Sequence, residues 1–284
     1  MHSPDPLVRA DGASSAPSVR QPHHLGLGRP GNRWPTVTAV IPTLNEADNL
    51  RWLLPRLTAV DEVVIVDGES TDGTVEITRL LRPDAVIIIE PPMGKGSAMR
   101  TGMAVASSEV LIMLDADGSM DPAEFDAFLA LIARGFDIVK GTRYGCGGAS
   151  DDLTRIRSKG NRWLTRLANL LYRTSWTDLC YGYVAMRRSA VERLQLTSTG
   201  FEIETEMCVN AVRSGLRMAE VASHEHHRRY GDSNLRTLRD GWRVLRTMVR
   251  LRLRGRLGDT HAGQALEPVA VSRLSTALGR AESR

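Results

Sequence analysis

The chain has 284 residues, 42% of them hydrophobic, and a formal net charge of +4 at pH 7. This length and composition suffice for a sizeable buried core, so a mini-protein that needs disulfide or metal staples is excluded. The three cysteines, Cys146, Cys180 and Cys208, are odd in number and widely spaced, which predicts neither a disulfide framework nor a cysteine-based zinc site and fits a reducing cytoplasm. No run of about eighteen apolar residues occurs, so no transmembrane helix is expected.

Residues 1–34 are rich in Pro, Gly, Ser, His and Arg and lack the apolar stretch of a signal peptide, so they predict a disordered tail. From Thr36 onward, short apolar strands alternate with helical segments. We predict strands at 36–41, 62–67, 85–90 and 110–115, with helices after Glu46, Gly73, Lys95 and Pro122. This βαβα order predicts an α/β fold in which helices flank a mostly parallel sheet.

The second half of the chain is less regular. Strands are predicted at 136–143, 181–188 and 217–225, and helices near 154–173 and 203–214. The last organised element is a basic amphipathic helix at 235–257, and a loosely ordered tail is expected at 258–284. We therefore expect one main domain, residues 35–234, to which the helix and the two tails are appended.

The acidic pair Asp115 and Asp117 is the most informative feature of the sequence. It follows four apolar residues, 111–114, and precedes a helical segment that Pro122 starts, so it lies at the carboxyl end of a predicted buried strand. Open α/β sheets bind ligands at that edge, and two carboxylates one residue apart can share a hard divalent cation that also binds phosphate oxygens. The pair therefore indicates a metal site for a nucleotide-diphosphate substrate, with a solvated turn of aspartates as the alternative.

Other loops at the predicted strand ends also carry polar groups. Residues 42–46, P-T-L-N-E, follow the first strand, and Asp67 leaves the second strand at the position of a nucleoside-recognising carboxylate. In the segment 94–102, Lys95 opens a helix whose free N–H groups and dipole favour an anion. Each loop alone fits an ordinary turn or cap, but together on one sheet edge they indicate a binding site.

The ordered set of motifs resembles the inverting glycosyltransferases of family 2, and within them the dolichyl- or polyprenyl-phosphate mannose synthase branch. The motifs span about Thr36 to Leu235 and read PTLNE, VDGESTDGT, GKGSAMRTG, LDADGSMDP, KGTRY, RSKGN, DLCYGYVAMRR, GFEIETEM and RRYGDSNL. The resemblance implies the GT-A fold, a nucleotide-sugar donor, Mg²⁺ or Mn²⁺ as cofactor, and transfer of one hexose to a lipid-linked phosphate.

The resemblance also implies roles for individual residues. Asp115 and Asp117 match the family's metal-binding D-x-D pair, with Asp117 as the direct ligand and a catalytic residue. The expected donor-binding set, to which Lys95 is added from its place at a helix start, is Pro42, Glu46, Asp67, Lys95, Asp115, Arg228 and Ser233. The acceptor-phosphate set is Arg143, also expected to be catalytic, with Arg157 and Ser158, since the planar fork of arginine can bind two phosphate oxygens.

The acceptor determines which chemistry is needed. A phosphomonoester is already an anion near neutral pH and can attack the anomeric carbon without a general base, provided it is held in line and its charge is screened. A hydroxyl acceptor, soluble or saccharide, needs a base, and Asp178 is the candidate by motif. Gly68 stands where the branch often has a second acid and Asn234 where a lysine is common, so GDP-mannose and UDP-sugars such as UDP-glucose both remain open as donors.

The predicted C-terminal helix bears on localisation. Residues 235–256 hold eight arginines and one acid, and Leu235, Leu238, Trp242, Leu245 and Val249 recur at helical spacing. Such a helix can lie on the cytoplasmic face of an anionic membrane, or it can pack on the main domain with solvated arginines. No recognised nucleic-acid motif accompanies this charge, so no nucleic-acid partner is expected. A nucleotidyltransferase is disfavoured because it would ordinarily have a glycine-rich signature directly after its first strand, where this chain has P-T-L-N-E. The sequence does not indicate the oligomeric state.

Overall fold

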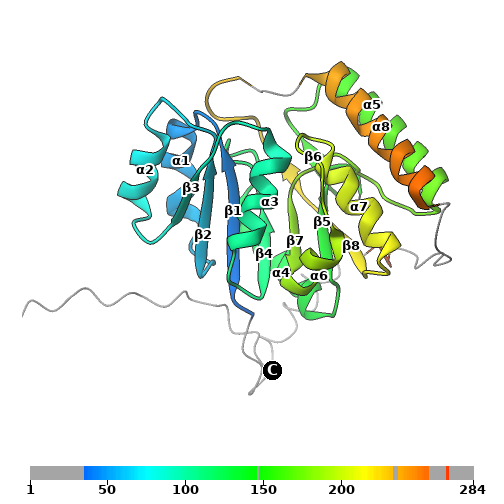
Figure 1. Ribbon diagram of the computed structural model, residues 1–284, viewed down its shortest axis with the longest axis horizontal. Helices are drawn as coiled ribbons and strands as arrows, with labels where there is room; N and C mark the ends of the chain where they lie inside the picture. Colours follow the sequence, from blue (N-terminus) through cyan, green and yellow to red (C-terminus); the bar gives the residue numbers. More distant parts are fainter. Residues whose placement is uncertain (1–34, 146, 233–235, 256–266, 269–284) are drawn as a thin grey trace, which may run out of the picture.

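The structure is a computed structural model that describes residues 35–145, 147–232, 236–255 and 267–268 (Figure 1). The predicted tail 1–34, Cys146 and Ser233 therefore lie outside the described residues. The centre is an eight-stranded sheet with the order β10-β8-β5-β7-β4-β1-β2-β3. Its strands are β1 (Val37–Thr43), β2 (Glu62–Asp67), β3 (Val86–Ile89), β4 (Val110–Met113), β5 (Ile138–Thr142), β7 (Val184–Arg187), β8 (Met218–Ala222) and β10 (Glu267–Pro268). A separate two-stranded sheet pairs β6 (Ala149–Ser150) with β9 (His224–Glu225).

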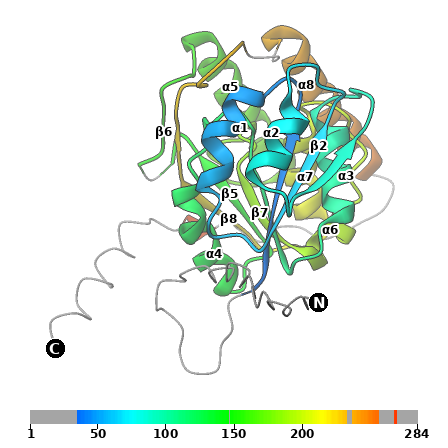
Figure 2. The same ribbon diagram turned by 90° about the vertical axis from the view of Figure 1, so that its left-hand side faces the viewer.

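Helices cover both faces of the large sheet (Figures 1 and 2). They are α1 (Ala47–Leu53), α2 (Thr74–Leu81), α3 (Lys95–Val105), α4 (Phe125–Ala133), α5 (Arg155–Tyr172), α6 (Arg188–Leu194), α7 (Ile203–Arg213) and α8 (Thr237–Gly255), with short 3₁₀ turns at Leu54–Arg56 and Pro122–Glu124. One apolar cluster lies under α1, α2 and α4, and a second lies under α3 and α5 to α8. The apolar strands β1, β2 and β4 are buried because these two clusters cover both of their faces. The predicted α/β fold with a mostly parallel sheet is confirmed.

The direction of β7 decides which loops meet. β1 runs parallel to β2 and β4, whereas β7 runs antiparallel to both β4 and β5. The amino end of β7 therefore lies at the same sheet edge as the carboxyl ends of β1, β4 and β5. As a consequence, residues 178–182 before β7 join the loops that follow the parallel strands.

The C-terminal helix is part of the main body of the molecule. In α8, Val244, Met248 and Leu251 are buried against α5 and α7, and the Tyr172 hydroxyl of α5 donates a hydrogen bond to the Met248 carbonyl at 2.6 Å. Of the stripe predicted from the sequence, Leu238 and Trp242 are 86% and 66% exposed on the other side of α8, whereas Leu245 is partly buried against the apolar cluster. Leu235 lies outside the described residues. None of the described helices is long and apolar enough to cross a membrane.

One segment of the expected C-terminal tail forms a strand. Glu267–Pro268 forms β10, which pairs in parallel with β8 at the edge of the sheet. The rest of the expected tail 258–284 lies outside the described residues.

Candidate active site

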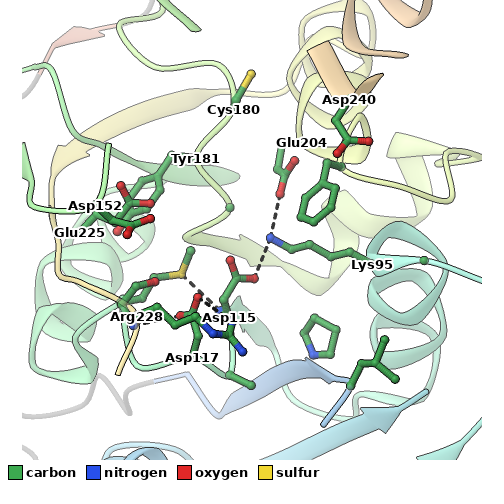
Figure 3. Close-up of a pocket in the computed structure, with 18 of the residues that line it drawn as sticks. Lys95, Asp115, Asp117, Asp152, Cys180, Tyr181, Glu204, Glu225, Arg228 and Asp240 are labelled. Atoms are coloured by element: carbon green, nitrogen blue, oxygen red, sulfur yellow. Dashed lines mark hydrogen bonds and ion pairs between the residues drawn. The ribbon is translucent and has the colours of Figure 1, made fainter. Parts of the chain in front are cut away.

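A cavity of about 630 Å³ opens at the sheet edge where β1, β4 and β5 end (Figure 3). Eight of the predicted site residues line it: Pro42, Glu46, Lys95, Asp115, Asp117, Arg143, Arg157 and Arg228. The acidic loop after β4 forms one end of the cavity. The other end lies between the first turns of α5 and α8, where Gly160, Asn161, Asp240 and Gly241 contribute to the wall.

Lys95 joins the acidic loop to α7. Its Nζ lies 2.7 Å from Asp115 Oδ1 and 3.0 Å from Glu204 Oε1 (Figure 3). Burial would lower the pKa of Lys95, but the two carboxylates outweigh burial and raise it. Gly182 makes room for this bridge, because a Cβ there would lie 2.7 Å from the Lys95 Nζ and 2.9 Å from Glu204 Oε1. Lys95 is thus a fully charged cation that fixes one side of Asp115.

Arg228 holds the second aspartate. Its Nη1 lies 3.4 Å from Asp117 Oδ2 and its Nη2 lies 2.5 Å from Glu46 Oε1, while the backbone N–H of Ser119 donates to Asp117 Oδ1. Burial, followed by the nearby charge of Asp115, raises the pKa of Asp117. Burial also raises the pKa of Glu46, against the opposing effect of Arg228. Negative charge is therefore concentrated at this end of the cavity.

The charge balance of this end fits a divalent cation. The four carboxylates of Glu46, Asp115, Asp117 and Glu204 meet the two cations Lys95 and Arg228, which leaves a formal charge of −2. Carboxylate oxygens are the donors that Mg²⁺ and Mn²⁺ prefer. The residues present are therefore suited to bind either ion.

Arg143 reaches the cavity wall but is already paired twice. Its Nε and Nη2 donate to the Asp178 carboxylate at 2.7 and 3.0 Å, and its Nη1 lies 3.0 Å from Glu225 Oε1. Burial would lower the pKa of Arg143, but these carboxylates outweigh burial and raise it. Two carboxylates thus compensate one guanidinium, so the cluster offers no net positive charge to an acceptor phosphate.

Three other predicted residues do not line the cavity. Asp178 is fully buried, and both of its oxygens accept hydrogen bonds from Arg143, with Asn161 as an additional donor. Asp67 is also fully buried and bonds to Thr43 Oγ1 and to the N–H and hydroxyl of Ser70, although the adjoining Gly68 does line the cavity. Ser158 accepts a hydrogen bond from the Tyr144 hydroxyl beside Arg157.

At the amino end of α3, where the sequence predicts N–H groups that favour an anion, the Ser97 N–H donates to the Gly94 carbonyl at 3.0 Å and to the Thr199 carbonyl at 3.1 Å. The loop at 198–200 comes this close because Gly96 has no side chain; a Cβ there would lie 2.7 Å from the Gly200 carbonyl oxygen. This segment contributes the side chain of Lys95 to the cavity wall.

Sequence reasoning did not identify several residues of the cavity wall. Glu204, Glu225, Asp152, Tyr181 and Asp240 are labelled in Figure 3 and come from five separate segments. Glu204 belongs to a run of three glutamates, which gives no local sign of which one meets Lys95. Glu225 and His227 belong to the run His224-Glu225-His226-His227, and this histidine-rich run is the sequence feature that could have indicated them.

The family model described as "Glycosyl transferase family 2" matches residues 38–195. Among curated relatives, the chain is 31% identical to Glycosyltransferase AglJ of Haloferax volcanii, over 72% of this chain and 68% of that protein. It is 32% identical to the dolichol-phosphate mannosyltransferase of Pyrococcus furiosus, over 70% of this chain and 59% of that protein.

A similar fold occurs in a solved structure. Glucosyl-3-phosphoglycerate synthase from Mycobacterium tuberculosis, in complex with Mn²⁺, UDP and glucosyl-3-phosphoglycerate, superposes with a TM-score of 0.61 at 19% identity, covering 87% of this chain and 98% of that one. At this identity the likeness shows the fold alone. The family match, the curated relatives and the sheet topology together show that this chain is a glycosyltransferase of family 2 with the GT-A fold.

Proposed function

We propose that this enzyme is an inverting, metal-dependent hexosyltransferase that acts on a lipid-linked phosphate of the polyprenyl or dolichyl type. The donor would be GDP-mannose or a UDP-sugar such as UDP-glucose. One observation carries the proposal: a single cavity joins the acidic pair after β4 to an opening between α5 and α8, two helices with exposed apolar and cationic side chains.

The acidic end of the cavity suits the donor. Mg²⁺ or Mn²⁺ at Asp115 and Asp117 would neutralise charge on the leaving nucleotide as the glycosidic bond breaks. Lys95 and Arg228 hold the two carboxylates in place from opposite sides. Arg228 is also near enough to the acidic pair to turn toward a diphosphate, while Pro42 and Glu46 line the adjoining wall, where the nucleoside would lie.

The other end of the cavity suits a phosphate. Arg157 lines it from the first turn of α5 and pairs with Asp152 at 3.2 Å, in a contact that remains partly open to solvent. An exposed pair of this kind is weak and can exchange for a phosphate. We assign acceptor binding to Arg157. For Arg143, which Asp178 and Glu225 compensate, we propose a positioning role.

The state of Asp178 favours a phosphate acceptor over a hydroxyl acceptor. A general base must come within hydrogen-bond reach of the proton that it removes. Asp178 is buried beneath Arg143, and burial, which alone would raise its pKa, is outweighed by Arg143, so that its pKa lies below the ordinary value of 3.8. A phosphate acceptor needs no such base, and the cavity then has to supply only alignment and charge screening.

The surface around α5 and α8 supports a lipid acceptor. The two helices lie side by side (Figure 1). The exposed apolar residues of α5 are Ile156, Trp163 and Leu170, and those of α8 are Leu238, Trp242, Val249 and Leu253. Arginines and Lys159 alternate with them, α5 contains no acid, and the single acid of α8, Asp240, is buried. We name this surface the α5/α8 face.

The composition of the α5/α8 face matches an anionic membrane surface. Tryptophan and aliphatic side chains enter the interfacial layer, and each cation near the surface contributes about 1 kcal/mol. We propose that the enzyme binds peripherally to the cytoplasmic face of the membrane in this way, so that the phosphate of a lipid acceptor enters between α5 and α8.

The test is transfer of labelled hexose to three acceptors: polyprenyl phosphate in anionic vesicles, 3-phosphoglycerate and a free sugar. We expect metal-dependent product with the lipid phosphate, and at least a hundredfold less with Asp117→Asn, equivalent to about 3 kcal/mol in the barrier. Asp48→Asn, at an exposed position of α1, is the control and should keep full activity. Product with 3-phosphoglycerate alone would overturn the lipid acceptor, and product with the free sugar alone would overturn a phosphate acceptor of either kind.

A further inference from the structure

A second cluster of metal-ligand side chains lies outside the cavity, where β6 and β9 pair. His224 and His226 are two residues apart on extended chain, so their side chains point to the same side. Ala149 of β6 is opposite His224, and the Asp151 N–H donates to the Glu225 carbonyl at 2.8 Å. This parallel pairing brings Asp151 alongside the two histidines.

The three side chains converge on one point. Asp151 Oδ2 lies 3.0 Å from His224 Nε2 and 3.6 Å from His226 Nδ1, and the three ligand atoms all lie within 4.8 Å of one another. Ligands about 2.0–2.1 Å from a tetrahedral Zn²⁺ ion are separated by roughly 3.3 Å. The distances from Asp151 Oδ2 to the two histidine nitrogens, 3.0 and 3.6 Å, are thus close to the spacing between ligands of one tetrahedral Zn²⁺ ion.

The Nε2 nitrogen of His224 lies near a carboxylate but makes no aligned hydrogen bond among the described residues. This nitrogen is shielded from solvent, and the carboxylate oxygen is 3.0 Å away. The His224 and His226 rings stack with centroids 4.5 Å apart, which places the two imidazoles side by side next to Asp151. A cation between the nitrogens and the carboxylate would satisfy all three groups.

We propose that Asp151, His224 and His226 bind one transition-metal ion, with Zn²⁺ as the best match and water at the fourth position. Imidazole nitrogen favours Zn²⁺ over Mg²⁺, so this ion differs in kind from the one assigned to Asp115 and Asp117. Binding of this ion does not depend on the proposed function, whereas its structural role beside the cavity rests on it.

The position of the site indicates a structural role. The chain neighbours of its ligands, Asp152 and His227, both line the cavity. A metal there would tie the loop that leads into α5, and so to Arg157, to the strand that leads to Arg228. It would thereby fix the acceptor side of the cavity relative to the donor side.

The test uses full-length, tag-free protein stripped with a chelator and titrated with Zn²⁺ by calorimetry and thermal unfolding. We expect one Zn²⁺ ion per chain whose binding does not require Asp117, and a rise in Tm, because the ion binds the folded chain and not the unfolded chain. His224→Ala and His226→Ala should each weaken this binding at least about tenfold. Asp117→Asn, which alters only the cavity pair, should retain it.

A variant that keeps a metal ligand at position 226 distinguishes loss of the ligand from misfolding. His226→Cys offers a thiolate in place of imidazole, so it should retain binding of Zn²⁺ and add a sulfur-to-metal absorption band with Co²⁺. The proposal is overturned if the wild type binds no Zn²⁺, if both alanine variants bind it as the wild type does, or if Asp117→Asn alone abolishes binding. It is equally overturned if His226→Cys binds Co²⁺ without the sulfur band.

Discussion

At the residue scale, the buried pair of Asp178 and Arg143 anchors the wall of the cavity. Burial raises the pKa of Asp178, but Arg143 outweighs burial and holds the pKa below 3.8. A carboxylate with a lowered folded-state pKa stabilises the native state above its unfolded-state pKa, and this contribution disappears as the pH falls through the folded value. We expect Asp178→Asn to lower the free energy of unfolding by about 3 kcal/mol at pH 7, since it breaks a buried pair.

Urea denaturation at several pH values checks this expectation. The difference between wild type and Asp178→Asn should be constant above about pH 5. It should narrow below about pH 4, because the unfolded chain then takes up a proton at Asp178 that the native state still excludes. Asp152→Asn is the matched control, because its pair with Arg157 is partly exposed and its loss should cost less than about 1 kcal/mol. An equal loss for both variants at pH 7 would contradict the structural role of Asp178.

The space beside Lys95 gives a second prediction at this scale. In Gly182→Ala, the new methyl group would displace the Lys95 Nζ from Asp115 and Glu204. We expect a loss of stability of about 1–3 kcal/mol from overpacking, together with weaker nucleotide binding. Gly160→Ala, in α5, meets nothing within 4 Å and should raise stability by about 0.5–1 kcal/mol with unchanged nucleotide binding. Chemical denaturation measures the stability of both variants, and nucleotide titration measures their affinity. Equal stability and equal nucleotide affinity of the two variants would contradict the prediction.

Long-range pairing explains why individual residues of the site were only partly predictable. Lys95, Asp115 and Asp117 belong to motifs whose chemistry can be inferred from a few neighbouring residues. The neutralisation of the Arg143 charge cannot be inferred in this way, because its partners Asp178 and Glu225 lie 35 and 82 residues away in the sequence. The charge of a residue can be read from the sequence. Whether that charge is available to a ligand depends on contacts with residues that are distant in the sequence.

At the element scale, the strands and helices follow from local pattern, but the orientation of α8 does not. Strand β2 was predicted with the bounds 62–67 that the structure has, and α5 to within one residue at each end. Helix α8 carries two apolar stripes at helical spacing, and only packing against α5 and α7 decides which is buried. That packing buries Val244, Met248 and Leu251 and leaves Leu238 and Trp242 exposed.

The exposed stripe leads to a prediction about membrane binding. Trp163→Ala combined with Trp242→Ala removes the two large aromatic side chains of the α5/α8 face. We expect this double variant to bind vesicles containing phosphatidylserine at least about tenfold more weakly, since each tryptophan buries a large apolar area in the interface. Vesicle co-sedimentation at low and physiological salt measures the affinity.

The control for this experiment is Leu80→Ala, which removes an apolar side chain that is 71% exposed on α2. It should bind vesicles as the wild type does. Equal vesicle binding by all three proteins would show that the α5/α8 face does not contact the membrane, while leaving the transfer reaction itself untouched.

At the scale of the whole molecule, one sheet edge gathers every charged group of the proposed reaction. The antiparallel strand β7 brings the Gly182 segment next to the loops after β4 and β5, and α8 closes the far side of the cavity. The donor end has a formal charge of −2 from four carboxylates and two cations. This excess negative charge means that an anionic donor should bind only together with a divalent cation.

The most direct test is therefore calorimetric titration of UDP and of GDP into the full-length protein, with Mn²⁺ and with EDTA. We predict that one of the two nucleotides binds with Mn²⁺, that EDTA abolishes binding, and that Asp117→Asn weakens it at least about tenfold while Asp48→Asn does not. Nucleotide binding of equal strength in EDTA, or in the Asp117→Asn variant, would contradict the assignment of Asp115 and Asp117 as the metal site of the donor.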